Sequence, residues 1–210
     1  MFCAYCHGRP GHMAINRTGI NMRKVTLLSG SPRLQGNTML ALKECAKAIE
    51  AEGVETEILS LAGKKIQSCQ HCGSCAMSGK CAIDDGLNEI AEKVRGSDGF
   101  IVGSPVYFGT PRGDLMSALQ RISCISMLAG GFLSRKVGGP IAICNNEGLT
   151  STNQSLLTFF LAGDMIVPGT RLFNGAHGNE PGEVLKDEAG MASIRRFGEN
   201  VAYLINVMKL

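Results

Sequence analysis

Several features are scarce in this chain of 210 residues, and each absence narrows what the protein can be. It has no tryptophan, and only 19% of its residues are charged, whereas 44% are hydrophobic. Long disordered chains have the opposite balance, so extended disorder is excluded. No run reaches the roughly 18 apolar residues that a membrane-spanning helix requires. The formal net charge of +3 is small and evenly spread, which argues against a nucleic-acid partner.

The first residues lack both a secretory signal and a periodic apolar pattern. Met1–Pro10 has no charged segment followed by an apolar one, so we expect a cytoplasmic protein. Residues 1–21 are rich in turn-forming residues, and we predict that they form a flexible extension. The pattern Cys3-Ala4-Tyr5-Cys6-His7 has the form of a c-type haem site. Such haem is attached outside the cytoplasm, so we assign it no role.

Residues 22–210 alternate between short apolar segments and segments with helical spacing, which predicts one domain. The predicted strands are Val25–Leu28, Val54–Leu59, Phe100–Val102, Pro140–Cys144 and Met165–Val167. The predicted helices are Thr38–Glu52, Asp85–Arg95, Asp114–Ile122, Thr152–Ala162 and a long C-terminal helix. This alternation predicts an α/β fold, a doubly wound five-stranded parallel sheet with helices on both faces. Ligands of such sheets bind beyond the carboxyl ends of the strands.

The loop after the first predicted strand has the composition of a phosphate-binding turn. Residues 29–38 read Ser-Gly-Ser-Pro-Arg-Leu-Gln-Gly-Asn-Thr and precede a helix, whose N-terminal N–H groups attract anions. The loop matches neither a GxGxxG nor a Walker A pattern. Its hydroxyls, amide and arginine suit a single terminal phosphate. An ordinary strand-to-helix turn, in which Asn37 caps the helix, explains the same residues equally well.

The loop after the third predicted strand places two aromatic residues between glycines. It reads Gly-Ser-Pro-Val-Tyr-Phe-Gly over residues 103–109. A planar ligand would stack on Tyr107 and Phe108 and accept backbone hydrogen bonds there. The alternative is that both rings simply cap the core.

Together, these two loops resemble those of NAD(P)H-dependent FMN reductases, a branch of the flavodoxin-like fold. The resemblance implies that residues 29–38 hold the phosphate of FMN and that Pro105–Gly109 line its isoalloxazine ring. A third loop, 145–148, matches this family less well, because it has two asparagines where the family has a glycine-rich stretch. The implied FMN-binding residues are Ser29, Ser31, Pro32, Arg33, Gly36, Asn37, Thr38, Pro105, Val106, Tyr107, Phe108, Gly109, Asn145 and Glu147.

Four of the nine cysteines lie in the loop at 60–84, after the second predicted strand. Their spacing, C-x2-C-x2-C-x5-C, is typical of iron–sulfur ligation, whereas zinc usually takes two separated pairs. The segment Cys69–Asp85 also resembles the cysteine motif of iron–sulfur flavoproteins, a subgroup of the same family, and this implies a 4Fe–4S cluster. Free thiols, or a disulfide formed on oxidation, fit the same spacing. The candidate metal ligands are Cys69, Cys72, Cys75 and Cys81.

The remaining cysteines are scattered, and a histidine lies within the cysteine loop. We expect Cys45 and Cys144 to be buried as small apolar residues, because one falls on an apolar helix face and the other in a strand. We expect His71 to face solvent, because four thiolates complete a ligand set without it.

Three functions remain open from the sequence. The first is an iron–sulfur flavoprotein oxidoreductase that passes electrons between FMN and a 4Fe–4S cluster, with NAD(P)H or ferredoxin as electron donor. The second is a cluster-free NAD(P)H-dependent FMN or quinone reductase, and the third is a non-enzymatic flavodoxin-like electron carrier. We identify no catalytic side chain. We expect a homodimer or homotetramer, with the apolar segment Met127–Leu133 as a subunit contact.

Overall fold

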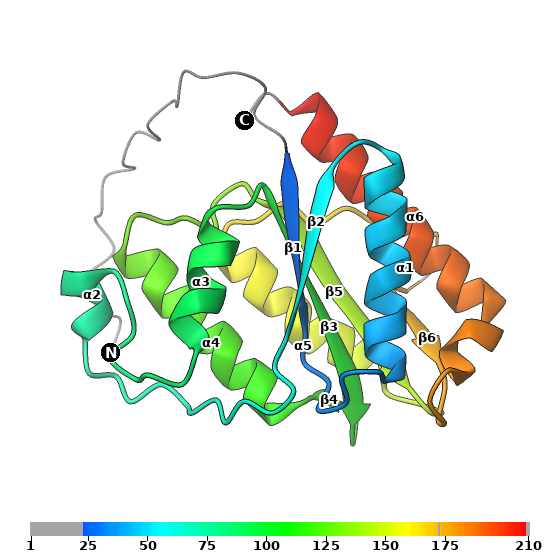
Figure 1. The fold of residues 1–210 in the computed structure, drawn as a ribbon, viewed down its shortest axis with the longest axis horizontal. Coiled ribbons are helices and arrows are strands. Elements are labelled where there is room, and N and C mark those ends of the chain that lie inside the picture. The colour runs from blue at the N-terminus through cyan, green and yellow to red at the C-terminus, as the bar shows by residue number, and fades with distance from the viewer. Residues whose placement is uncertain (1–22, 172, 209–210) are drawn as a thin grey trace.

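Short apolar segments form the strands of a central sheet, and amphipathic segments between them form helices (Figure 1). The computed structural model describes residues 23–171 and 173–208, and the predicted extension, 1–21, lies outside them. The elements are β1 (Lys24–Ser29), α1 (Asn37–Ala51), β2 (Glu55–Ser60), α2 (Ser74–Ser78), α3 (Leu87–Arg95), β3 (Gly99–Tyr107), β4 (Thr110–Pro111), α4 (Gly113–Leu128), β5 (Val137–Cys144), α5 (Leu149–Ala162), β6 (Gly175–His177), a 3-10 turn (Glu183–Lys186) and α6 (Glu188–Val207).

The sheet has the order β2-β1-β3-β5-β6, and these five strands are parallel. The two-residue β4 adds to the end of β3 in the antiparallel direction. The predicted parallel α/β sheet is therefore confirmed. Because the strands are parallel, their carboxyl ends share one edge, the lower edge in Figure 1. The strand order reverses between β1 and β3, which is where such sheets bind their ligands.

The two faces of the sheet are covered by different helices (Figure 1). Along β1, Leu27 belongs to the core beneath α1 and α6, whereas Leu28 belongs to the core beneath α3, α4 and α5. Neighbouring residues of a strand point to opposite faces, so an unbroken apolar run is what a sheet covered on both sides requires.

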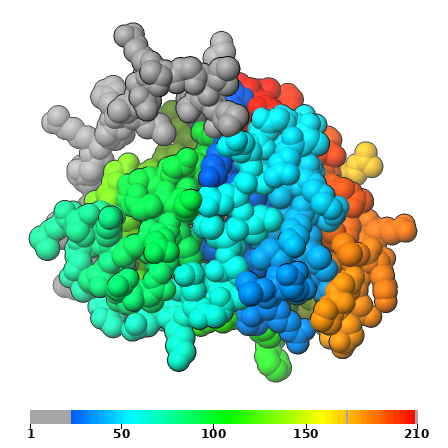
Figure 2. Space-filling view, in the orientation of Figure 1, coloured from blue at the N-terminus to red at the C-terminus, as the bar shows by residue number. Residues whose placement is uncertain are grey.

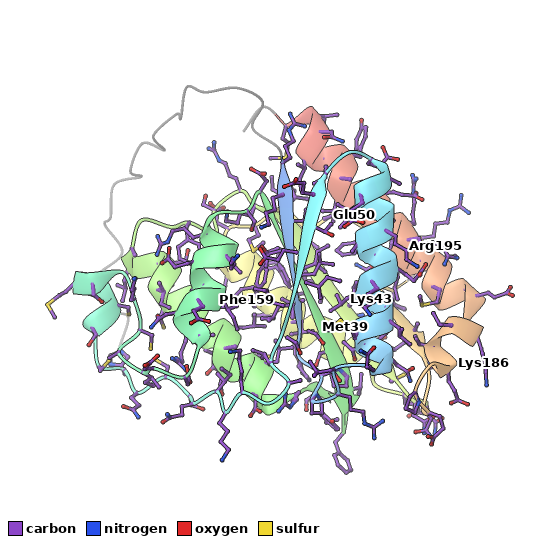
Figure 3. All side chains as sticks on the ribbon, in the orientation of Figure 1. Met39, Lys43, Glu50, Phe159, Lys186 and Arg195 are labelled. Carbon is purple, nitrogen blue, oxygen red and sulfur yellow. The ribbon has the colours of Figure 1, made fainter. Side chains whose placement is uncertain are left out.

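Helices α1 and α6 pack closely on one face. A Cβ atom added to Gly198 of α6 would lie 2.7 Å from the carbonyl oxygen of Cys45 on α1, so only glycine allows this approach. Lys43 and Arg195 lie on the outer side of this helix pair (Figure 3). The packing fixes the N-terminal end of α1 at the ligand edge of the sheet.

The edge strand differs from the prediction. Met165–Val167 was predicted as the fifth strand, but there Ile166 makes just an isolated parallel bridge to Val137, at the start of β5. Pairing resumes at β6, whose Gly175 lies opposite Ala142 near the end of β5. Pro168 follows two residues after Ile166, and proline lacks the N–H group that would continue the ladder. The edge strand is thus split in two, and its second half lacks an apolar pattern.

Two other sequence expectations concern surfaces. Within the described residues, no helix is both long enough and apolar enough to cross a membrane.

The segment predicted as a subunit contact, Met127–Leu133, is partly covered: Met127 is exposed, but Leu133 is buried in the core. The ring of Phe132 lies 4.4 Å below the guanidinium of Arg95.

Candidate functional site

A hollow of about 190 Å³ lies at the ligand edge, where the loops after β1, β3, β5 and β6 meet. Its lining is Ser31, Pro32, Arg33, Gly36, Asn37, Thr38, Pro105, Val106, Tyr107, Ile143, Cys144, Asn145, Gly178 and Asn179. Ten of these residues are implied FMN contacts from the sequence. The other four, Ile143, Cys144, Gly178 and Asn179, were missed.

The loop after β1 is held by its own short side chains and by the neighbouring strand. The N–H of Ser31 donates to the Ser29 hydroxyl (3.4 Å), and that of Arg33 donates to the Ser31 hydroxyl (3.1 Å). The N–H of Gly30 donates to the carbonyl of Gly103 on β3 (2.7 Å). Ser29 therefore supports the loop from beneath and is not part of the lining. These hydrogen bonds, within the loop and to β3, fix the conformation of its backbone.

Asn37 does not cap α1, contrary to the prediction. Gly36 is the N-cap residue, and among the described residues no side chain caps this helix end. The Asn37 amide instead donates to the carbonyl of Glu180 (2.9 Å), and its oxygen accepts from the N–H of Gly182 (2.8 Å). Asn37 thus ties the loop after β6 to the start of α1. Gly36, Asn37 and Thr38 at the start of α1 line the hollow, so the helix N-terminus lies at its edge, as an anion site requires.

The aromatic loop after β3 is a tight hairpin at the mouth of the hollow. β3 extends to Tyr107, beyond its predicted end at Val102, and β4 turns back against it. Phe108 (φ +49°) and Gly109 (φ +75°) form the turn. Tyr107 lines the hollow and is 46% exposed, and Phe108 is fully exposed. The alternative that these rings cap the core is therefore wrong.

The third loop is divided between two hollows. Asn145 lines the first, whereas Glu147 lines a neighbouring hollow of about 480 Å³ together with Ser151 and His177. Gly148 (φ +95°) packs so closely that a Cβ atom there would lie 2.8 Å from Cγ1 of Val106. The loops after β3 and β5 are thus in direct contact.

The cysteine loop leaves the same edge of the sheet after β2 and runs outward to α2, a short helix that sequence reasoning missed (Figure 1). Figure 2 shows this cyan-to-green segment on the surface of the molecule. Cys69 and Cys72 are exposed, and Cys75 and Cys81 are half-buried. His71 is exposed, as expected.

The four thiols of this loop lie close enough to influence one another. Burial raises the pKa of Cys75, and the charges of Cys81, Cys69 and Cys72 act in the same direction. Hydrogen bonds from the backbone and the hydroxyl of Ser74 lower the pKa of Cys72. Within the described residues, no three His, Cys, Asp or Glu side chains are arranged to hold a single metal ion.

A fifth thiol, which the sequence interpretation treated as scattered, faces this loop from α4. Burial raises the pKa of Cys124 to about 11, and the neighbouring Cys69 contributes through its charge and a hydrogen bond. Cys45 and Cys144 are buried, as expected. Ser117, Arg121 and Cys124 have the spacing of residues on one side of a helix. This pattern could have indicated from the sequence that α4 contacts the cysteine loop.

Comparison with known proteins identifies the group to which this sheet edge belongs. Residues 23–180 match the family described as NADPH-dependent FMN reductase. The chain belongs to this family. A relative from Methanocaldococcus jannaschii, named an iron–sulfur flavoprotein, is 39% identical over 193 residues, which span 89% of this chain and 99% of that protein.

Solved structures show the same fold. RosB with bound 8-demethyl-8-formylriboflavin-5'-phosphate has a TM-score of 0.70 at 19% identity, over 88% of this chain and 79% of that one. A WrbA-like flavodoxin from Agrobacterium tumefaciens has a TM-score of 0.62 at 14% identity, over 89% and 98% of the two chains. The predicted flavodoxin-like fold is confirmed, and the family makes this chain an FMN-dependent oxidoreductase.

The hollow of this FMN reductase family member fits one part of a flavin nucleotide better than the whole. Ligand pockets usually measure roughly 300–1,000 Å³, and this hollow measures about 190 Å³. It combines a helix N-terminus, hydroxyls and the guanidinium of Arg33, which suit a phosphate-bearing tail. The exposed aromatic hairpin beside it suits a planar ring.

The cysteine loop fits a cluster better than a single ion. The ligands of one zinc ion converge on a point, and this thiol set does not. A 4Fe–4S cluster takes four cysteine thiolates, and this loop carries four cysteines, two exposed and two half-buried. The donor set therefore suits an iron–sulfur cluster in kind and number.

Proposed function

We propose that this FMN-dependent oxidoreductase is an iron–sulfur flavoprotein, which holds FMN at the hollow and a 4Fe–4S cluster in the cysteine loop and passes electrons between them. When bound, FMN exchanges electrons in pairs with a hydride donor and singly with a cluster. The protein contributes placement and charge, and needs no acid–base side chain for this exchange.

This proposal is supported by helix α4, which contacts both loops. At its N-terminal end, the Arg112 guanidinium donates to the carbonyl of Gly30 in the loop after β1 (3.1 Å). About two and a half turns further along, the Arg121 guanidinium donates to Cys81 Sγ (3.3 Å). A rigid helix that touches both loops keeps them at a constant separation, which electron transfer between two cofactors requires.

On the flavin side, the first turn of α1, the hydroxyls of Ser31 and Thr38, and the charge of Arg33 bind the phosphate. Tyr107 and Phe108 flank the ring. Asn145 and Glu147 complete the site from the third loop, each from its own hollow. Charge-assisted hydrogen bonds to the phosphate are the strongest of these contacts.

The first experiment is an anaerobic ultraviolet–visible spectrum with an iron and sulfide assay on freshly purified protein. We expect flavin bands, a broad iron–sulfur shoulder and about four irons per chain. Flavin bands without iron would overturn the cluster and leave a cluster-free NAD(P)H-dependent FMN or quinone reductase. The exposure of Cys69 and Cys72 favours that second function, because free thiols occupy such positions without cost.

The same flavin bands can be used to identify the electron donor. We propose NAD(P)H or reduced ferredoxin as donor. If the protein is a reductase, adding NADPH without ferredoxin should bleach the flavin bands. Bleaching by reduced ferredoxin but by neither nicotinamide would indicate an electron carrier without enzymatic activity.

We also propose a homodimer or homotetramer. Tyr107 and Phe108 are exposed beside the hollow, and a second subunit would cover a ring stacked there. Light scattering of the FMN-loaded protein should give at least twice the chain mass, and a monomer would contradict this arrangement.

A further inference from the structure

Among the described residues, Arg121 is the most deeply buried charged residue that the flavin site does not use. Its side chain is 1% exposed, although it lies on α4 beneath an exposed loop. A buried guanidinium is costly unless every donor is paired. Each of its five N–H groups therefore needs an acceptor.

The two terminal nitrogens hold the ends of the cysteine loop. Nη1 donates to the carbonyl of Gln67 (3.1 Å), and Nη2 donates to the carbonyl of Ile83 (3.1 Å). Both also donate to the carboxylate of Asp85, at 2.5 and 3.1 Å. Gln67 precedes the first cysteine of the motif by two residues, and Ile83 follows the last by two. The guanidinium thus closes the loop at its neck.

The fifth donor goes to a sulfur atom. Nε of Arg121 lies 3.3 Å from Sγ of Cys81, with a hydrogen bond directed at the sulfur. The backbone of Cys81 is fixed as well, because its N–H and carbonyl both pair with the side-chain amide of Asn88 on α3 (2.8 and 2.9 Å). Cys81 is therefore anchored from two helices, whereas Cys69 and Cys72 face solvent.

The Asp85 carboxylate shows why closure alone does not explain this arrangement. The bidentate pair with Asp85 uses Nη1 and Nη2, and it already satisfies the buried charge. The pair holds the pKa of Asp85 below its usual value: desolvation raises that pKa, but the hydrogen bonds from Arg121 and Gln67 outweigh it. Nε adds nothing to this ion pair, and its donor points at a candidate cluster ligand.

We propose that Arg121 is a positioning residue for the cluster, which closes the cysteine loop and donates a charged hydrogen bond to the Cys81 sulfur that raises the reduction potential. This inference rests on the proposed iron–sulfur function. Reduction adds negative charge to a cluster, and hydrogen bonds to its sulfurs set the potential. A hydrogen bond from the Arg121 Nε to one ligand sulfur therefore stabilises the reduced form, and lysine keeps the charge but lacks this Nε–H donor.

The test compares Arg121→Lys and Ser117→Ala in anaerobically purified protein. Ser117 is a matched control, because its hydroxyl contacts Ser68 of the same loop neck (3.0 Å) but no sulfur. We expect Arg121→Lys to lower the midpoint potential, measured by spectroscopically monitored redox titration. At the wild-type midpoint, the ratio of reduced to oxidised cluster should fall about tenfold, which corresponds to about 59 mV. Ser117→Ala should leave it unchanged.

Asp85→Asn provides a second variant with the opposite sign. It loosens the same neck but removes a negative charge, so we expect its midpoint potential to rise. A merely structural role predicts that Arg121→Lys and Asp85→Asn act alike. Equal potentials in wild type and Arg121→Lys, or a fall in both variants, would overturn the proposal.

Iron content separates this inference from the proposed function. Wild-type protein without iron overturns the iron–sulfur function before any variant is compared. Iron in the wild type together with an unshifted Arg121→Lys potential overturns the role of Arg121 alone. If Arg121→Lys loses iron while Ser117→Ala keeps it, the role of Arg121 in closing the loop is supported. The midpoint potential of Asp85→Asn then tests the effect of charge on the cluster: a rise supports it and a fall contradicts it.

Discussion

Two loops leave the same edge of the sheet and are built in opposite ways. The loop at 29–36 is folded by contacts over a few residues and by one neighbouring strand, and Ser29 and Ser31 within it are buried. The cysteine loop is longer and largely exposed, and side chains from distant positions on α3 and α4 hold it. The first is preformed by the fold, whereas the second depends on a few long-range anchors.

The largest expected effect tests whether the two loops are independent. Replacing Cys75 by serine removes one of four thiolates, so we expect iron to fall from about four per chain to almost none. FMN content should stay near one per chain, because no residue of the flavin hollow lies in the cysteine loop. Iron and flavin assays on the same anaerobic sample check this. Parallel loss of FMN would show that the loops form one unit.

The second prediction breaks the flavin side alone. A Cβ atom at Gly178 would lie 2.5 Å from the N atom of Val184, and backbone cannot yield as a flexible side chain does. We expect Gly178→Ala to weaken FMN binding at least tenfold, measured by fluorescence titration, with iron unchanged. Gly169→Ala is the matched control, because a Cβ atom there meets nothing within 4 Å. Equal FMN affinity in both variants would mean that the loop after β6 does not shape the site.

The same contrast explains what the sequence could predict. Residues 29–38 and 103–109 were found because each is a continuous segment at the end of a strand, and ten of the implied contacts do line one hollow. The role of Asn37 was missed because its partners lie more than 140 residues away. The contacts of Arg121 and Cys124 with the cysteine loop were missed for the same reason. The apolar periodicity of α4 predicts which side of the helix is buried against the sheet, but not which loop packs against its other side.

The third prediction concerns the long-range tie on the flavin side. Asn37→Ala removes two hydrogen bonds that hold Glu180 and Gly182 to the start of α1. Each such bond contributes roughly 0.5–1.5 kcal/mol, so we expect FMN affinity to fall about tenfold without loss of iron. Lys43→Ala, on the exposed side of the same helix, is the control. An unchanged affinity would mean that the first turn of α1 binds phosphate without this support.

The smallest expected effect is a pH dependence of the free energy of unfolding that comes from Asp187, which holds the loop after β6. Asp187 caps α6 by accepting from the N–H of Gly190 (2.9 Å) and also accepts from the N–H of His177 (2.8 Å), next to the flavin hollow. Desolvation raises the pKa of Asp187, but these hydrogen bonds outweigh it and hold the pKa below its usual value. A carboxylate at a helix N-terminus contributes roughly 0.3–1 kcal/mol, and Asp187→Asn should lower the free energy of unfolding by that amount at pH 7.

The sign of this effect follows from the lowered pKa of Asp187 in the folded protein. Its stabilisation is complete above the ordinary aspartate pKa of about 3.9, and it is lost as the pH falls through the lower folded value. Denaturant unfolding of wild type and Asp187→Asn should therefore differ at pH 5, and the difference should shrink below about pH 4. A difference that grew as the pH fell below about 4 would show that the neutral side chain, not the carboxylate, holds this loop.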